Sequence, residues 1–125
     1  MARERLNFRP GTLDLIGIRA NDRNHMQVTL KQGGVPWDTT GAVVAAQART
    51  TANSEEVGIE ASVTEVDTTV GQYVLKWAGA DVATLLGGAA TWDGVWDLQV
   101  LESGQDEPET VLEGVFQAES DVTRP

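Results

Sequence analysis

A repeated alternation between apolar and polar side chains constrains the fold of this chain more than any other feature. In HMQVTLKQ, residues 25–32, Met26, Val28 and Leu30 alternate with polar neighbours. A side-chain period of two is typical of a β-strand with one buried and one solvated face. The same period returns in residues 13–20 (weakly), 41–49, 57–66, 71–77, 95–102 and 110–119. Seven short strands with turn signals between them predict an all-β fold, an antiparallel β-sandwich.

The alternation also predicts which side chains face the core. In residues 41–49 the inward face carries Ala46 and Ala48, whereas Val43 and Arg49 lie on the opposite face. Small side chains opposite large ones are how a thin sandwich core is filled. The inward residues predicted for the later strands are Val57, Ile59, Ala61, Val63, Tyr73, Leu75, Trp77, Trp96, Leu98, Val100, Leu112, Gly114, Phe116 and Ala118.

Two segments between the strands have distinct local signals. In VPWDTTG, residues 35–41, Pro36 suits a strand edge and Asp38 can accept a hydrogen bond from the backbone two residues on. Gly41 then allows a turn. In GADVATLLGG, residues 79–88, the pattern predicts one short helical connection that Asp81 caps and Gly87 ends. Val82, Leu85 and Leu86 share one face of that helix.

The length of 125 residues fits one domain with a single core. We expect an N-terminal arm over residues 1–12, a β-sandwich over residues 13–120 and a C-terminal tail over residues 121–125. The chain has no cysteine, which excludes disulfides, thiolate metal sites and thiol catalysis. We expect no signal peptide and no membrane association, because no apolar run approaches the roughly 18 residues of a membrane span.

The net charge of −10 is unevenly distributed. Residues 1–49 carry seven basic and four acidic side chains, a net charge of +3, and residues 50–125 carry two basic and fifteen acidic ones, a net charge of −13. An acidic body opposes nucleic-acid binding, which needs clustered Lys and Arg. The basic end can steer the chain onto an acidic protein, including another copy. The simpler interpretation is a solvated surface that keeps the protein soluble.

The residues give no pattern that predicts catalysis. His25 is the one histidine and has neither a second metal ligand nor a nucleophile-elbow serine to serve. The carboxylate pairs, Glu55 with Glu56 and Asp106 with Glu107, fall in predicted turns, where carboxylates are hydrated. A weak calcium site in residues 106–109 is a minor alternative, although the spacing misses the EF-hand loop. We therefore expect no cofactor, no metal and no small-molecule substrate.

The four tryptophans divide into two pairs. Trp77 and Trp96 fall on predicted inward faces, which favours burial. Trp37 and Trp92 lie beside turns, where packing and surface contact are both open. Exposed tryptophans can stack on sugars, as in a carbohydrate-binding module, or anchor a protein interface.

Several stretches, in order along the chain, resemble the N-terminal immunoglobulin-like domain of phage upper baseplate proteins and the small tail-associated proteins built from that domain alone. These stretches are MQVTLKQGG (26–34), the Asp-Thr-Thr-Gly corner with the strand that follows (37–49), ADVATLLGG, GVWDLQV (94–100) and TVLEGVFQAESDVTR. The resemblance covers roughly residues 25–124. This sequence departs from the family in Ala46 and Ala48, where larger aliphatic residues are usual, and in its basic arm.

The resemblance implies an immunoglobulin-like sandwich and a non-enzymatic structural protein of a bacteriophage virion, assembled in the host cytoplasm. The implied role is a minor tail or baseplate component, in several copies, that docks onto other phage structural proteins or onto copies of itself in a symmetric ring. The residues assigned to these contacts are Arg3, Arg5, Phe8, Arg9, Trp37, Trp92, Val122 and Arg124. The alternatives are a capsid decoration protein of the same fold and the carbohydrate-binding module.

Overall fold

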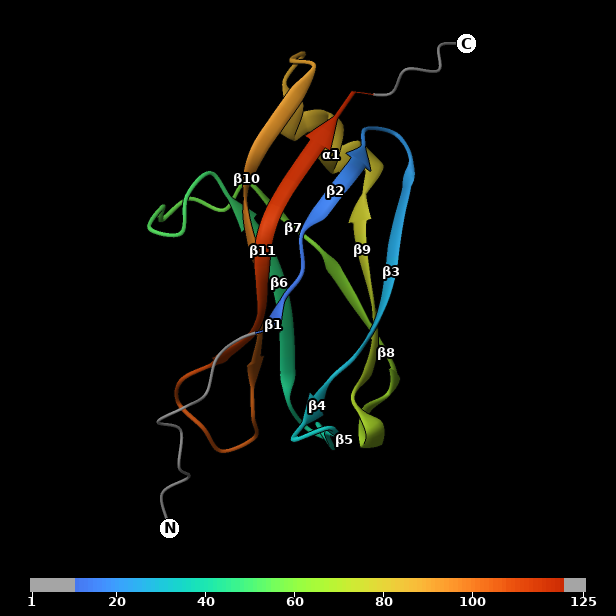
Figure 1. Ribbon diagram of the computed structural model, residues 1–125, viewed down its shortest axis with the longest axis vertical. Coiled ribbons are helices and arrows are strands. Elements are labelled where there is room, and N and C mark those ends of the chain that lie inside the picture. The colour runs from blue at the N-terminus through green and yellow to red at the C-terminus, as the bar shows by residue number, and fades with distance from the viewer. Residues whose placement is uncertain (1–10, 121–125) are drawn as a thin grey trace.

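Residues 11–120, the part of the chain that the computed structural model describes, form two β-sheets that face each other (Figure 1). The larger sheet contains β1 (Gly11–Thr12), β2 (Leu15–Arg19), β6 (Val43–Arg49), β7 (Ile59–Glu60), β10 (Thr91–Leu101) and β11 (Glu109–Glu119). The smaller sheet contains β3 (Arg23–Thr29), β8 (Ser62–Asp67) and β9 (Gln72–Ala78). A hairpin of β4 (Lys31–Gln32) and β5 (Val35–Pro36), a 3-10 turn η1 (Thr68–Val70) and one helix, α1 (Gly79–Leu86), complete these residues. The predicted all-β sandwich is confirmed.

The strand order places the first and last strands of the described residues, β1 and β11, side by side at one edge of the larger sheet. That order is β1-β11-β10-β6-β7, with β2 also beside β11, and the smaller sheet runs β3-β9-β8. β1 and β2 pair with β11 in parallel, whereas the other pairs are antiparallel. The expected purely antiparallel arrangement is therefore wrong at this edge. No hairpin connects β1 or β2 to β11, so loop geometry does not force the antiparallel direction there.

The register confirms the predicted faces of β6 and β10. Trp96 on β10 lies opposite Ala48 on β6, and Leu98 lies opposite Ala46. Both alanines are fully buried, whereas Val43 on the other face of β6 is 63% exposed. The predicted pairing of small and large side chains in the core is confirmed.

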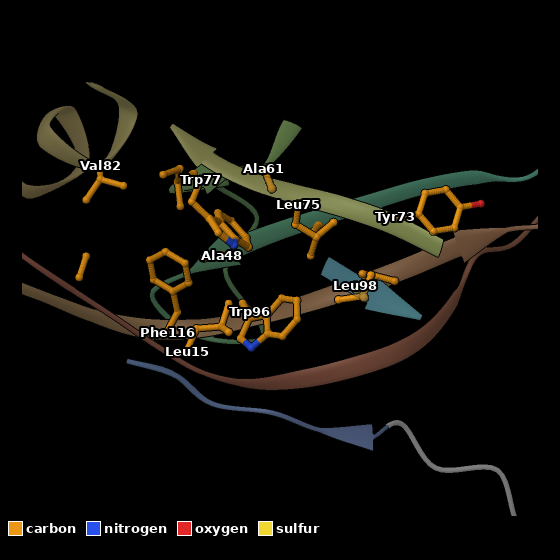
Figure 2. Packing of buried hydrophobic residues seen from close by; sticks show 14 of the residues in the cluster. Leu15, Ala48, Ala61, Tyr73, Leu75, Trp77, Val82, Trp96, Leu98 and Phe116 are labelled. Carbon is orange, nitrogen blue, oxygen red and sulfur yellow. The ribbon is translucent and has the colours of Figure 1, made fainter. Parts of the chain in front are cut away.

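The core lies between the sheets and is centred on three aromatic rings (Figure 2). Trp77 from β9 meets the edge of Trp96 from β10 with ring centroids 6.1 Å apart and planes at 89°. Trp77 also contacts Phe116 from β11, with ring centroids 4.9 Å apart. Edge-to-face pairs of this kind add to the stabilisation that burial of the rings provides. The rings thus pack the two sheets against each other.

The corner after β5 forms the predicted turn. The Asp38 carboxylate accepts hydrogen bonds from the Thr40 hydroxyl at 2.6 Å and from its backbone N–H at 3.0 Å. These bonds hold the pKa of Asp38 below its ordinary value. Thr39 turns inward instead, where its hydroxyl group bonds the hydroxyl of Tyr73. Gly41 has a φ of 82°, which confirms the need for glycine there.

The helix α1 connects β9 to β10 and closes one end of the sandwich (Figure 1). Gly87 ends it in the left-handed conformation, as predicted, and Val82 and Leu86 are buried. The expected capping by Asp81 is wrong, because the N-cap is Ala78 and makes no side-chain hydrogen bond. The helix begins directly where β9 ends, so Asp81 lies inside the first turn. A carboxylate there still complements the helix dipole.

The sandwich begins earlier in the chain than expected. β1 pairs Gly11 with Leu112 and Thr12 with Glu113, so the last two residues assigned to the arm belong to the sheet. Residues 1–10 and the tail, 121–125, lie outside the described residues.

Candidate interaction surface

The outer face of the larger sheet carries a shallow hollow over β11, β10 and β6. Its volume is about 410 Å³. Side chains that alternate with the core residues form its floor, among them Gln47 and Arg49 of β6 and Val95 and Asp97 of β10. The register places Val95 beside Arg49 and Asp97 beside Gln47. Three neighbouring strands thus contribute to one site.

β11 and the segment between β1 and β2 form one wall of the hollow. Val115 lies beside Val95, and Glu113 lies beside Asp97. The Asp14 carboxylate accepts a hydrogen bond of 3.0 Å from the Val115 backbone N–H. The loop after β6 closes the opposite side through Ala52. The lining is therefore part apolar and part acidic.

Gly114 and Trp96 fix the position of this wall. A β-carbon on Gly114 would stand 2.1 Å from the Leu13 carbonyl oxygen, so only glycine admits the crossing chain. The Trp96 indole N–H donates a 2.7 Å hydrogen bond to that same carbonyl. The Leu13 backbone N–H in turn bonds the Glu113 carbonyl at 2.9 Å. A core residue therefore holds a surface segment in place.

The charged groups of the hollow are incompletely paired. Arg49 donates from Nη2 to Gln47 Oε1 at 2.7 Å, but its buried Nε finds no acceptor among residues 11–120. Burial raises the pKa of the Asp97 carboxyl above its ordinary value, and Glu113 adds to the rise. Arg49 and Gln99 oppose it. Asp97, Asp14 and Glu113 outnumber Arg49 by three charges to one, so the hollow attracts cations.

Exposed apolar side chains extend the same face toward β2. Ile16 of β2 is 69% exposed and Val115 of β11 is 39% exposed. The hollow and these two residues form a mixed apolar and acidic surface, which we call the outer-face patch. Apolar contact area flanked by charge is the composition of protein-binding surfaces.

The two tryptophans assigned to surface contacts differ in their environment. Trp37 is only 6% exposed and packs in the core, so its role as a contact residue is corrected. Its backbone N–H bonds the Leu30 carbonyl at 2.9 Å, which draws the ring under the sheet. Trp92 is partly buried and meets Phe116 edge to face at 5.9 Å.

A sugar-stacking platform built from both rings is not assembled. Trp37 follows β5, at the end of the sandwich away from α1, whereas Trp92 packs near Leu85 of α1 (Figure 1). The other assigned contact residues, Arg3, Arg5, Phe8, Arg9, Val122 and Arg124, lie outside the described residues.

The groups weighed for catalysis or metal binding are dispersed over the surface. His25 is exposed on β3 opposite Lys76 of β9. Glu55 and Glu56 lie in the loop after β6, and Asp106 and Glu107 lie in the turn between β10 and β11. Within residues 11–120 no three metal-ligating side chains come together. The same residues include no helix of the length and apolar character that a membrane crossing requires.

The outer-face patch was not recognised in the sequence, because Arg49, Asp97 and Glu113 are far apart along the chain. Only the register of three strands brings them together. A usable signal was present in Val95 and Val115, which are apolar side chains on predicted outward faces. Comparison of the chain with protein-family models and with curated proteins finds no match.

Proposed function

We propose that the protein is a non-enzymatic structural component of a bacteriophage virion, which docks in several copies onto neighbouring virion proteins as a minor tail or baseplate protein. The observation that carries the proposal is the succession of family-like stretches along the chain. Each falls in one element or junction of the sandwich: residues 26–34 in β3 and β4, the corner before β6, α1, β10 and β11.

The strand order supports the immunoglobulin-like part of the proposal. In immunoglobulin sandwiches the strands G, F and C lie side by side in one sheet, and B, E and D lie in the other. The neighbours β11-β10-β6 and β3-β9-β8 follow these two series in chain order. The helix α1 then occupies the connection between the strands equivalent to E and F.

The outer-face patch supports docking. Ile16 and Val115 expose apolar surface on the face that carries the hollow, and the acidic side chains of the hollow outnumber Arg49. Such a surface gains stability when a partner covers the apolar groups and supplies opposite charge. The aromatic rings packed beneath the larger sheet hold the patch in a fixed shape.

Reconstruction of purified phage particles tests the proposal. Density for the sandwich at the tail tip or baseplate, repeated by the local symmetry, is the expected result, with the outer-face patch facing a neighbour. A particle population labelled through a tag after residue 125 provides the control for location. Density on the shell would replace the tail role by the capsid decoration role. Absence of the chain from purified, infectious particles would contradict the proposal in both forms.

A further inference from the structure

The outer-face patch has a complementary segment in the chain itself. Residues 1–10, MARERLNFRP, contain three arginines and one glutamate, together with Leu6 and Phe8. Bound as an extended strand, the segment would place Leu6 and Phe8 on one side and Arg5 and Arg9 on the other, because side chains alternate along a strand. The hollow offers Val95 and Val115 to the apolar side chains and acidic groups to the arginines.

We propose that residues 1–10 of one copy bind in the hollow of the next copy, so that the protein assembles head to tail through arm exchange. This inference rests on the proposed function, which requires copies of the chain to contact one another. A contact of this kind joins two different surfaces, and it closes into a ring when the rotation between copies permits.

The direction of β1 favours the neighbouring copy over the arm's own sandwich. β1 is parallel to β11 and runs toward the hollow, with Gly11 beside Leu112 and Thr12 beside Glu113. β1 therefore enters the sheet from the end away from the hollow. An arm that filled its own hollow would have to reverse direction beside Gly11. Ten residues reach about 33 Å when extended, which is long enough to cross three strands of another copy.

The charge state of the hollow adds a second reason for a cationic occupant. Asp97 is half-buried with Glu113 beside it, and Arg49 is partly engaged by Gln47. An arginine from the arm places a cation next to two carboxylates whose mutual repulsion it relieves.

Sedimentation velocity on the full chain tests the proposal. We expect reversible self-association that strengthens with concentration and weakens when the salt is raised from about 0.05 to about 0.5 M. Arg5→Glu with Arg9→Glu reverses the charge of the arm, and Glu113→Lys neutralises the charge of the hollow. Each change should weaken association about tenfold or more, which corresponds to about 1.4 kcal/mol. Glu65→Lys, the same charge change on exposed β8 of the other sheet, is the matched control and should leave association within about twofold.

A mixing experiment distinguishes exchange from general charge effects. The chain with the reversed arm retains an acidic hollow, and the chain with Glu113→Lys retains a basic arm. Mixed in equal amounts, the two should form a complex of one copy each, because one complete junction is available. Circular dichroism of each variant confirms that the strands remain folded.

Three outcomes overturn the proposal. One is a wild-type chain that stays monomeric over roughly a hundredfold range of concentration, which places the arm on its own sandwich or on neither. The second is association that Glu65→Lys weakens as much as Glu113→Lys does. The third is a mixture of the arm variant and the Glu113→Lys variant that forms no complex. All are measured in solution, so a failure here leaves the virion role to the particle reconstruction.

Discussion

Trp77 of the smaller sheet and Trp96 of the larger sheet face each other across the core, yet their indole N–H groups differ in hydrogen bonding. Trp77 is fully buried and Trp96 is 2% exposed. The Trp96 N–H donates to the Leu13 carbonyl at 2.7 Å. The buried N–H of Trp77 has no acceptor within residues 11–120. In Figure 2, Trp77 projects from one layer of strands, and Trp96 and Phe116 project from the other.

The difference shows that two equally buried rings contribute differently to the structure. Trp77 stabilises the fold through buried area and ring contacts alone, at the cost of an unpaired polar group. Trp96 adds a hydrogen bond that connects the core to the segment between β1 and β2, and this segment forms a wall of the hollow. The larger sheet therefore joins the core to the candidate interaction surface, and the smaller sheet does not.

Truncation of Trp77 gives the largest expected effect. Trp77→Ala leaves a cavity where Trp96 and Phe116 now meet the ring. We expect the free energy of unfolding to fall by about 3–5 kcal/mol. Urea denaturation followed by circular dichroism measures it. A loss below about 1 kcal/mol would show that the core collapses around the gap, and the ring contacts would then carry little stability.

Replacing each tryptophan by phenylalanine tests the comparison directly. Both changes remove similar indole volume, but Trp96→Phe also leaves the Leu13 carbonyl without its donor. We expect Trp96→Phe to cost about 2–3 kcal/mol and Trp77→Phe to cost at least about 1 kcal/mol less. Thermal unfolding at matched conditions measures both. Equal costs would break the comparison, because they would show that the indole hydrogen bond contributes nothing net.

Gly114→Ala approaches the same contact from the surface side. Its β-carbon would meet the Leu13 carbonyl, so the segment between β1 and β2 must shift. We expect a loss of about 1–2 kcal/mol. Combined with Trp96→Phe, the loss should be smaller than the sum, since both changes disturb one contact. Strict additivity in this double-mutant cycle would contradict the proposed connection. Ser62→Ala, exposed on β8, serves as the control within about 0.5 kcal/mol.

The smallest expected effect is the contribution of Asp97 to the pH dependence of stability, compared with that of Asp38. Burial raises the pKa of Asp97, so its ionisation opposes folding, and this penalty is absent below the pKa of the unfolded chain. Asp97→Asn should therefore be more stable than the wild type at neutral pH, and the gap should close as pH falls through the acidic range. Thermal melts at several pH values measure it.

Asp38→Asn should show the opposite sign. The Thr40 hydrogen bonds lower the pKa of Asp38, so its carboxylate stabilises the fold above the unfolded pKa, and this contribution is lost as pH falls through the folded pKa. The variant should be less stable than the wild type at neutral pH, with a gap that also closes in acid. Gaps of the same sign for both variants would contradict these assignments.

Much of the fold follows from local patterns in the sequence. The alternation in Met26–Lys31 and the alanines of β6 predicted the buried faces, and Asp38, Gly41 and Gly87 predicted two chain reversals. In each case the signal and its physical cause lie within a few residues. Seven of the described strands have five or more residues. The single strand expected over residues 57–66 is instead two, β7 in the larger sheet and β8 in the smaller, and Val57, expected to face inward, is 41% exposed.

The remaining features depend on contacts between distant residues. Nothing near Gly11 indicates that β1 pairs in parallel with β11. Trp37 stands beside a turn, and its burial depends on a backbone bond to Leu30 across the hairpin of β4 and β5. The outer-face patch required the register of Arg49, Val95 and Val115. Side-chain periodicity assigns a residue to a face but does not identify its neighbours on adjacent strands.

The parallel pairing of β2 with β11 has a mechanical consequence. A load applied between residue 11 and residue 120 pulls β2 and β11 in opposite directions along their common axis, because the two strands run the same way. The interstrand hydrogen bonds then bear the tension together in shear, whereas a hairpin pulled at its open end loses them one after another. Forced unfolding is limited by the rate of that concerted rupture. A module linked to neighbours through its ends would thus resist extension along the sheet that carries its hollow.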